Sequence, residues 1–284
     1  MEKLYFKVIK LYLNLLSVIA PQHGGKTAIN VFLTVRLKKI KEREKAFYSK
    51  AKAFTLEPKI VSNSHNIKYY ELGEANTKIV FLIHGWNSNA GSLSRFAFEL
   101  SKTHRVISLD LPAHAHSKGK RTNLFECKEV LKKFIAHINP KETFSIVGHS
   151  FGAAVVAYAL SETQHHVDKV VLLSANNKLK IIFREFQKMI GFNDTIYNEI
   201  EKWIKSIFNL DLEKLVLSDI IKKIKFNDLL IIHDKFDKVI PVKSAEEIKK
   251  AIPNIKLSVY QKIGHYRMLW NEDVVSETVK FIKE

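Results

Sequence analysis

Cysteine is nearly absent from this sequence. Its 284 residues include only Cys127, so no disulfide can form within the chain, and a reducing, cytoplasmic location is expected. The twelve histidines are scattered, and the pair at 165–166 has no cysteine or acidic residue at a metal-ligand spacing. The sequence therefore predicts neither a metal site nor a bound cofactor.

Acidic residues are few compared with basic ones. The formal net charge is +17, and residues 1–60 alone carry thirteen lysines and arginines against four acidic residues. No nucleic-acid-binding motif accompanies this charge, so no nucleic-acid partner is expected. A solvated basic surface explains it most simply, and peripheral contact of residues 1–60 with an anionic membrane is the alternative.

A long hydrophobic run is also missing. The apolar segment at 11–20, "LYLNLLSVIA", is too short to span a bilayer. A signal peptide fits poorly, because Pro21 would directly follow a cut after Ala20. An amphipathic helix fits better, and the pattern favours packing on the protein's own body over lying on a membrane.

Strand-like and helix-like patterns alternate over most of the chain. The strand-like runs are mostly continuous and apolar, as expected for strands buried on both faces; they are 67–72, 78–83, 105–110, 144–149, 169–175, 228–234 and 256–262. Helical patterns lie between them, at 92–102, 123–138, 151–163, 243–251 and 271–283. The alternation predicts an α/β fold, a mostly parallel central sheet with helices on both faces.

Two segments fall outside this rhythm. Residues 1–60 read as a basic helical extension, with a loop at "QHGGK" followed by one long helix up to residue 54. Residues 176–226 contain only helical patterns and read as a lid-like insert between two strands. The core domain is then expected at 61–175 and 227–284.

A serine stands between two glycines where a strand pattern gives way to a helix pattern. The stretch "FSIVGHSFGAA" contains G-x-S-x-G, the arrangement of a nucleophile elbow. Gly148 and Gly152 fit a turn too tight for a Cβ atom. Ser150 would then project at the start of a helix, whose N-terminus stabilises developing negative charge. We therefore take Ser150 as the candidate nucleophile.

Two later loops supply partners for this serine. "KIGHYRML" places His265 after the last strand pattern, where it can act as the base that a serine hydroxyl needs. "HDKFDKVIP" offers two acids to orient that histidine. Asp237, at the loop apex, is the preferred one, and Asp234, at the strand end, is the alternative.

Groups that would hold an oxyanion are expected after the strand pattern at 78–83. The backbone N–H groups of Trp86 and Phe151 are the candidates. His84, Gly85 and His149 are expected to line the site or to bond loop backbone.

These motifs together resemble the α/β-hydrolase family. The matching features are "HGW", "LDLPAHAHS", "GHSFG", "HDKFDKVIP" and the final "GH", in the family's order and over residues 65–284. The family often has P-G-H-G-x-S where this chain has P-A-H-A-H-S, which leaves the shape of that loop open. Asp110, His114 and His116 are expected to order it.

The resemblance implies a serine hydrolase, most simply of carboxylic esters, acting on a small-molecule or lipid ester. The same residues serve thioesterases, peptidases and C–C hydrolases, and fold alone does not separate them. Phe183 and Phe186 in the lid-like insert are expected to pack, with an apolar acyl pocket as their second role. A different class remains open: a membrane- or partner-binding protein on a hydrolase scaffold with little activity.

Overall fold

A computed structural model describes residues 2–36, 39–57 and 66–284. It divides the chain into two units, one of residues 1–34 with 178–216 and one of residues 35–177 with 217–284. Residues 178–216, most of the lid-like insert predicted at 176–226, are therefore part of the same unit as the N-terminal helices, while 217–226 belong with the sheet. The larger unit is called the sheet unit below, and the smaller one the helical unit.

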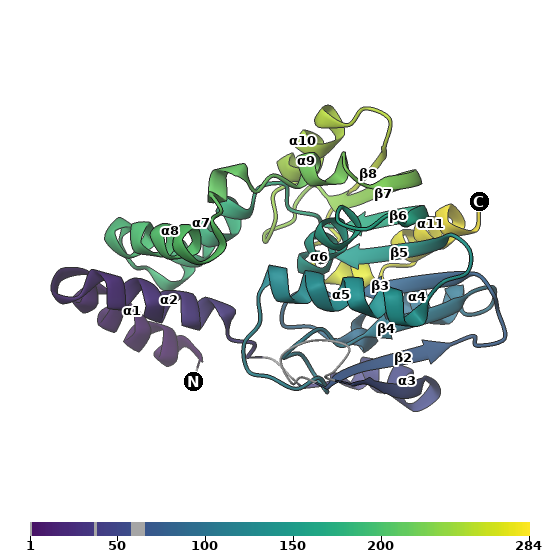
Figure 1. Ribbon diagram of the computed structural model, residues 1–284, viewed down its shortest axis with the longest axis horizontal. Helices are drawn as coiled ribbons and strands as arrows, with labels where there is room; N and C mark the ends of the chain where they lie inside the picture. The colour runs from purple at the N-terminus through teal and green to yellow at the C-terminus, as the bar shows by residue number, and fades with distance from the viewer. Residues whose placement is uncertain (1, 37–38, 58–65) are drawn as a thin grey trace. The chain divides into compact units, whose positions relative to one another are not determined.

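An eight-stranded sheet, in the order β1-β2-β4-β3-β5-β6-β7-β8, forms the centre of the sheet unit (Figure 1). The strands are β1 Lys52–Leu56, β2 Ile67–Leu72, β3 Ile79–Ile83, β4 Arg105–Leu109, β5 Phe144–His149, β6 His166–Leu173, β7 Lys225–Asp234 and β8 Lys256–Tyr260. β1 and β2 pair antiparallel with each other, and β2 pairs antiparallel with β4. Every pair from β4 to β8 is parallel, so the fold class predicted from the continuous apolar runs is confirmed.

Helices cover both faces of this sheet. Those of the sheet unit are α3 Glu42–Lys50, α4 Ser94–Leu100, α5 Leu124–Ile138, α6 Phe151–Leu160, α9 Leu217–Ile221, α10 Lys243–Ala251 and α11 Glu272–Lys283, with short 3₁₀ turns at Ala90–Leu93 and Arg267–Trp270. Side chains of α3, α4 and α11 share one buried cluster with Val80 and Leu82 of β3. On the opposite face, Phe81 contacts Phe134 of α5. The alternation of side chains along β3 thus fills both layers.

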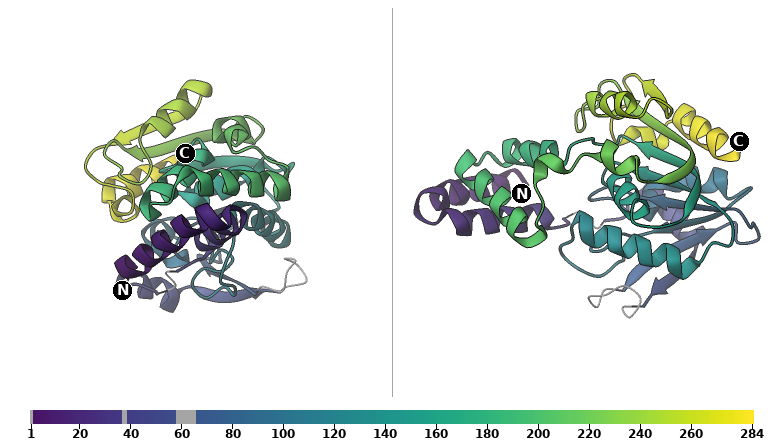
Figure 2. Two further views of the ribbon diagram at one scale, coloured as in Figure 1. Left: turned by 90° about the vertical axis from the view of Figure 1, so that its left-hand side faces the viewer. Right: turned by 45° about the horizontal axis from the view of Figure 1, so that its top comes forward.

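The helical unit is built from two helix pairs far apart in sequence. α1 Glu2–Ile19 and α2 Pro21–Leu33 lie beside α7 Leu179–Ile190 and α8 Asp194–Phe208, purple against green in Figures 1 and 2. A 3₁₀ turn, Leu212–Lys214, follows α8. Pro21 separates α1 from α2, because proline cannot donate the backbone bond that a continuous helix needs but suits a first turn. Among the residues described, no helix combines the length and apolar character needed to cross a membrane.

The N-terminal third differs from the prediction in two places. "QHGGK" was predicted as a loop, yet it lies inside α2. Close packing explains the glycines there, since a Cβ added to Gly24 would lie 2.3 Å from Cδ1 of Ile196. The prediction of one long basic helix up to residue 54 is also wrong. α2 ends at Leu33, α3 follows, and the chain then enters the sheet as β1. Pairing of β1 with β2 overrides the local helical pattern.

Candidate active site

The turn between β5 and α6 holds Ser150 in a strained conformation. Its φ is 55° and its ψ is −116°, a region that residues with side chains rarely adopt. A Cβ on Gly152 would lie 2.4 Å from the backbone oxygens of Ile83 and His84, and one on Gly148 would lie 2.8 Å from the Cα of Ala153. The glycines therefore allow the sharp turn that the motif predicts.

Three side chains from three separate loops form one hydrogen-bonded chain. His265 Nε2 lies 3.0 Å from Ser150 Oγ, and His265 Nδ1 lies 2.7 Å from Asp237 Oδ2. The side chains of His265 and Asp237 are almost fully buried. The structure thus brings together the serine, the histidine and the preferred acid. They lie in the segments that follow the carboxyl ends of β5, β8 and β7, respectively.

Asp237 is surrounded by donors. Besides His265, its oxygens accept from the hydroxyl of Ser174 at 3.0 Å and from the N–H groups of Val239 at 2.7 Å and Ile240 at 2.9 Å. Burial alone would raise the pKa of Asp237, but the hydrogen bond from His265, the electrostatic interaction with that side chain and the N–H groups of Ile240 and Val239 hold the pKa at about 2. The carboxylate is therefore ionised at neutral pH.

The alternative acid, Asp234, has a different environment. Its oxygens accept the N–H of Phe236 at 2.8 Å and the N–H of Ile263 at 2.7 Å. It thus ties the loop after β7 to the loop after β8, while Asp237 is the acid that accepts the hydrogen bond from His265.

Ser174, at the end of β6, is a contact that the sequence did not reveal. It is buried, has a φ of 49° and donates its hydroxyl to Asp237. "VVLLSA" carries no motif, and the only signal is a small polar residue at the end of an apolar strand.

His149, inside the G-x-S-x-G motif, supports the backbone of His265. Its Nε2 lies 3.0 Å from the His265 carbonyl oxygen, and the two rings lie 4.9 Å apart. A carbonyl oxygen only accepts, so Nε2 carries the proton. Burial, with a smaller effect of His265, lowers the pKa of His149 to about 3. The ring is therefore neutral, buried and turned to loop backbone.

The two candidate oxyanion donors lie on segments that meet at the elbow. A Cβ built on Gly85 would lie 3.3 Å from the Cβ of Ser150, so the loop carrying Trp86 runs close to the serine. The rings of Trp86 and Phe151 are 5.0 Å apart, edge to face. Phe151 is the first residue of α6, where a helix leaves backbone N–H groups without an intrahelical partner.

Two buried histidines join the loop after β3 to the loop after β4. His84 Nε2 accepts the N–H of Leu111 at 3.0 Å, and His114 Nε2 accepts the N–H of Asn87 at 3.2 Å. Each histidine has its other ring nitrogen on a carbonyl oxygen, that of Gly85 for His84 and that of Pro112 for His114. We call this reciprocal pair the histidine clamp.

The loop after β4 keeps left-handed backbone without glycine. Ala113 has a φ of 64° and Ala115 a φ of 40°, where the resembling family often has glycine. Asp110, fully buried, holds the loop by accepting the N–H groups of Ala90 and His116, and the Nδ1 of His116 lies 3.3 Å from the same carboxylate. The expectation that polar residues order this loop matches these contacts.

Exposed apolar side chains flank the hydrogen-bonded chain. Phe236 and Val239 stand on either side of Asp237 in sequence, and Tyr266 follows His265; all three are largely exposed. The Tyr266 ring lies 4.8 Å from the His265 ring.

Phe183 and Phe186 lie in the helical unit. Both are buried, and both contact Phe32 of α2, with ring centroids 4.4 and 5.0 Å apart. These contacts give them a packing role within their own unit.

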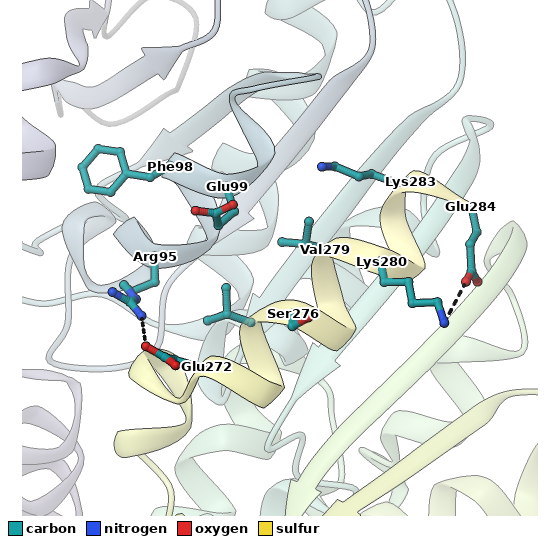
Figure 3. A pocket seen from close by; sticks show the side chains of 10 residues that line it. Arg95, Phe98, Glu99, Glu272, Ser276, Val279, Lys280, Lys283 and Glu284 are labelled. Atoms are coloured by element: carbon teal, nitrogen blue, oxygen red, sulfur yellow. Dashed lines mark hydrogen bonds and ion pairs between the residues drawn. The ribbon is translucent and has the colours of Figure 1, made fainter.

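A groove of about 690 Å³ lies between α4 and α11 (Figure 3). Its walls are mostly charged, and an Arg95–Glu272 ion pair of 3.1 Å crosses it. Ser150, His265 and Asp237 are not among its lining residues. Among the described residues, no group of three histidine, cysteine or acidic side chains is arranged to hold a metal ion.

Comparison with known proteins gives the same fold. A family model for the alpha/beta hydrolase fold matches residues 78–200. Lipase 1 of Psychrobacter immobilis is 25% identical over 265 residues, covering 78% of this chain and 81% of the lipase. The magnesium-chelatase 30 kDa subunit of Rhodobacter capsulatus is 32% identical over 108 residues, and the chain spans only 37% of its length. The esterase Pf2001 of Pyrococcus furiosus superposes with a TM-score of 0.66 at 20% identity, covering 88% of this chain and 97% of the esterase.

Proposed function

This chain has the α/β-hydrolase fold, and on that premise we propose that it hydrolyses carboxylic esters with Ser150 as the nucleophile. The observation that carries the proposal is the continuous hydrogen-bonded chain from Ser150 through His265 to Asp237. A serine hydroxyl is a poor nucleophile unless an adjacent base accepts its proton, and this chain supplies both the base and the group that orients it.

Asp237 fixes the protonation pattern of the histidine. Its carboxylate, with a pKa of about 2, accepts a hydrogen bond from Nδ1 of His265. Nε2 is then left with a lone pair that faces the Ser150 hydroxyl. His265 is thereby set up as a general base toward Ser150.

The reaction then runs in two acyl transfers. Ser150 Oγ attacks the ester carbonyl while its proton moves to Nε2 of His265, and the tetrahedral intermediate collapses as that proton passes to the departing alcohol. Water next attacks the acyl-serine, giving its proton to the same nitrogen. Collapse returns the proton to Ser150 Oγ and releases the carboxylic acid, which restores the starting state.

The backbone N–H groups of Trp86 and Phe151 are the proposed donors to the oxyanion. The first turn of α6 adds the partial positive charge of a helix N-terminus at the same place. One such donor is worth about 3 kcal/mol of transition-state stabilisation.

An apolar acyl group or alcohol suits the surroundings best. Phe236, Val239 and Tyr266 are exposed on the loops that carry Asp237 and His265, so burial of apolar substrate surface there would be favourable. The similar proteins named lipase and esterase agree with an ester bond as the target.

Hydrolysis of p-nitrophenyl esters from C2 to C16 tests this function. Wild type is expected to release nitrophenol with a clear chain-length preference, and Ser150→Ala is expected to keep the fold and lose at least a thousandfold in kcat. An active Ser150→Ala variant would contradict the proposal. Thioesters and C–C substrates, run alongside, identify the bond if esters are poor substrates.

A further inference from the structure

One face of α1 carries a row of exposed apolar side chains. Leu11 is 71% exposed and Val18 is 81% exposed. The whole exposed set recurs every three or four residues, so it lies on one side of the helix; it comprises Tyr5, Val8, Leu11, Tyr12, Leu15, Val18 and Ile19. We call this set the α1 apolar face. Isolated exposed apolar residues are ordinary, but a continuous stripe of this kind marks an interaction surface.

The opposite side of α1 already anchors the helix. Leu13 and Leu16 are buried, and Ser17 Oγ accepts a hydrogen bond from Asn193 Nδ2 at 2.8 Å. A Cβ on Gly24 of α2 would lie 3.2 Å from the Leu16 Cβ, which shows how closely α1 and α2 pack. The α1 apolar face can therefore contact another surface without disturbing the packing of α1 in the helical unit.

Positive charge accompanies this face. Lys7 is exposed on α1 at the edge of the stripe, and Glu2 is the only acidic residue in the sequence of the helix. Lys10 lies further round the helix, where its side chain runs close to Gly191 at the end of α7. Residues 1–34, the N-terminal part of the helical unit, contain four lysines and one glutamate, a net charge of +3. An apolar stripe on a helix with an excess of lysine is typical of helices that lie in the interface of an anionic bilayer.

We propose that α1 binds the surface of an anionic lipid bilayer, with the α1 apolar face in the acyl-chain boundary and Lys7 at the headgroups. The helix lies along the surface, since none of the described helices is apolar and long enough to cross. The binding is separate from the chemistry at Ser150, so a catalytically dead chain binds equally well.

A single environment-sensitive label tests where the lipid is touched. Cys127 is buried, and burial raises the pKa of its thiol, so it reacts slowly. A nitrobenzoxadiazole label on Val18→Cys is expected to brighten and shift to the blue with phosphatidylcholine/phosphatidylglycerol vesicles at 7:3. The same label on Val259→Cys, an exposed apolar position on β8, is the matched control and stays unchanged. An unchanged Val18→Cys signal, with the full chain, overturns the proposal.

Vesicle flotation of charge variants tests how much the α1 apolar face and its lysine contribute to lipid binding. Leu11→Glu/Leu15→Glu is expected to lower the lipid-bound fraction at least tenfold, while Met189→Glu/Ile207→Glu, which adds the same charges at exposed positions of α7 and α8, leaves it unchanged. Replacing Lys7 with glutamine lowers binding about fivefold. Circular dichroism verifies that each variant is folded.

Three results contradict the assignment. Wild type fails to float with anionic vesicles, or it floats equally with pure phosphatidylcholine, or both double-glutamate variants lose binding to the same extent. Size-exclusion chromatography tests whether a second copy of the chain binds the α1 apolar face instead. A wild-type dimer that Leu11→Glu/Leu15→Glu converts to a monomer, with no lipid binding by either protein, would assign the face to a second copy and overturn the lipid proposal.

Discussion

His84 and His114 each accept a backbone N–H from the loop that carries the other. His84 takes the N–H of Leu111 at 3.0 Å, and His114 takes that of Asn87 at 3.2 Å. Both acceptors require an unprotonated Nε2, and the rings lie 5.0 Å apart in an edge-to-face arrangement. The histidine clamp thus fixes the loop on which the Trp86 N–H, a proposed oxyanion donor, is carried.

Loss of the clamp is expected to reduce turnover more than substrate binding. His114→Ala removes this acceptor from the half-buried Asn87 N–H, a cost of about 0.5–1.5 kcal/mol. We expect kcat to fall by up to about tenfold with little change in KM, since the oxyanion forms only in the transition state. His137→Ala, at an exposed position of α5, is the control. Equal effects of the two substitutions on steady-state kinetics would argue against the clamp.

Asp237 and Asp234 offer a matched pair of substitutions. Asp237→Asn is expected to lower kcat by about 10⁴, because the amide leaves His265 in the wrong tautomer. Asp234→Asn removes charge from a carboxylate that bonds the N–H groups of Phe236 and Ile263, so it lowers the melting temperature and keeps kcat within about tenfold. Steady-state kinetics and calorimetry distinguish the two. A reversed order would transfer the orienting role to Asp234.

Acid is expected to destabilise the fold through His149. Its pKa falls from 6.5 to about 3 in the folded state because of burial, so the unfolded chain binds the proton more readily. The stabilising contribution is therefore complete above pH 6.5 and is lost as the pH falls from 6.5 toward 3, by up to about 1.4 kcal/mol per pH unit. His149→Gln flattens this part of the profile when unfolding in urea is followed at several pH values. An equally steep profile in the variant would show that other groups cause it.

The left-handed alanines are expected to carry strain. Ala113→Gly relieves about 1–2 kcal/mol of left-handed backbone strain and loses about 0.4–1 kcal/mol through the freer unfolded chain, for a net stabilisation of about 0.5–1 kcal/mol. Ala136→Gly, in the exposed face of α5, instead costs about 1 kcal/mol. Urea unfolding measures both. Destabilisation by Ala113→Gly as large as that by Ala136→Gly would contradict the strain.

The strands were predictable where a continuous apolar run indicates a strand buried on both faces. β3 and β5 are continuous apolar strands whose predicted positions agree with the structure, and the apolar part of β7 was predicted while its polar first residues, 225–227, were not. β1 was missed because "KAFTL" gains its stability from pairing with β2, a contact that local pattern does not contain. The helix through Gly24 was missed for the same reason, since Ile196 is far away in the sequence.

The residues of the candidate site also divide into those that the sequence predicts and those whose contacts appear only in the structure. Ser150, Asp237 and His265 were identified because motif order and loop position constrain them. The donation from Ser174 and the reciprocal bonds of His84 and His114 depend on how loops meet in space. No sequence signal describes such contacts, so only the structure reveals them.

Fluorophosphonate labelling, located by peptide mass spectrometry, tests whether Ser150 is an activated nucleophile. One adduct is expected on Ser150 in wild type and none in Ser150→Ala, and labelling is expected to be at least a hundredfold slower in His265→Ala. His265→Ala is informative because it keeps the serine and removes the base. Labelling of Ser150 at the wild-type rate in His265→Ala, or no labelling of the folded wild type, would show that Ser150 is not a nucleophile activated by His265.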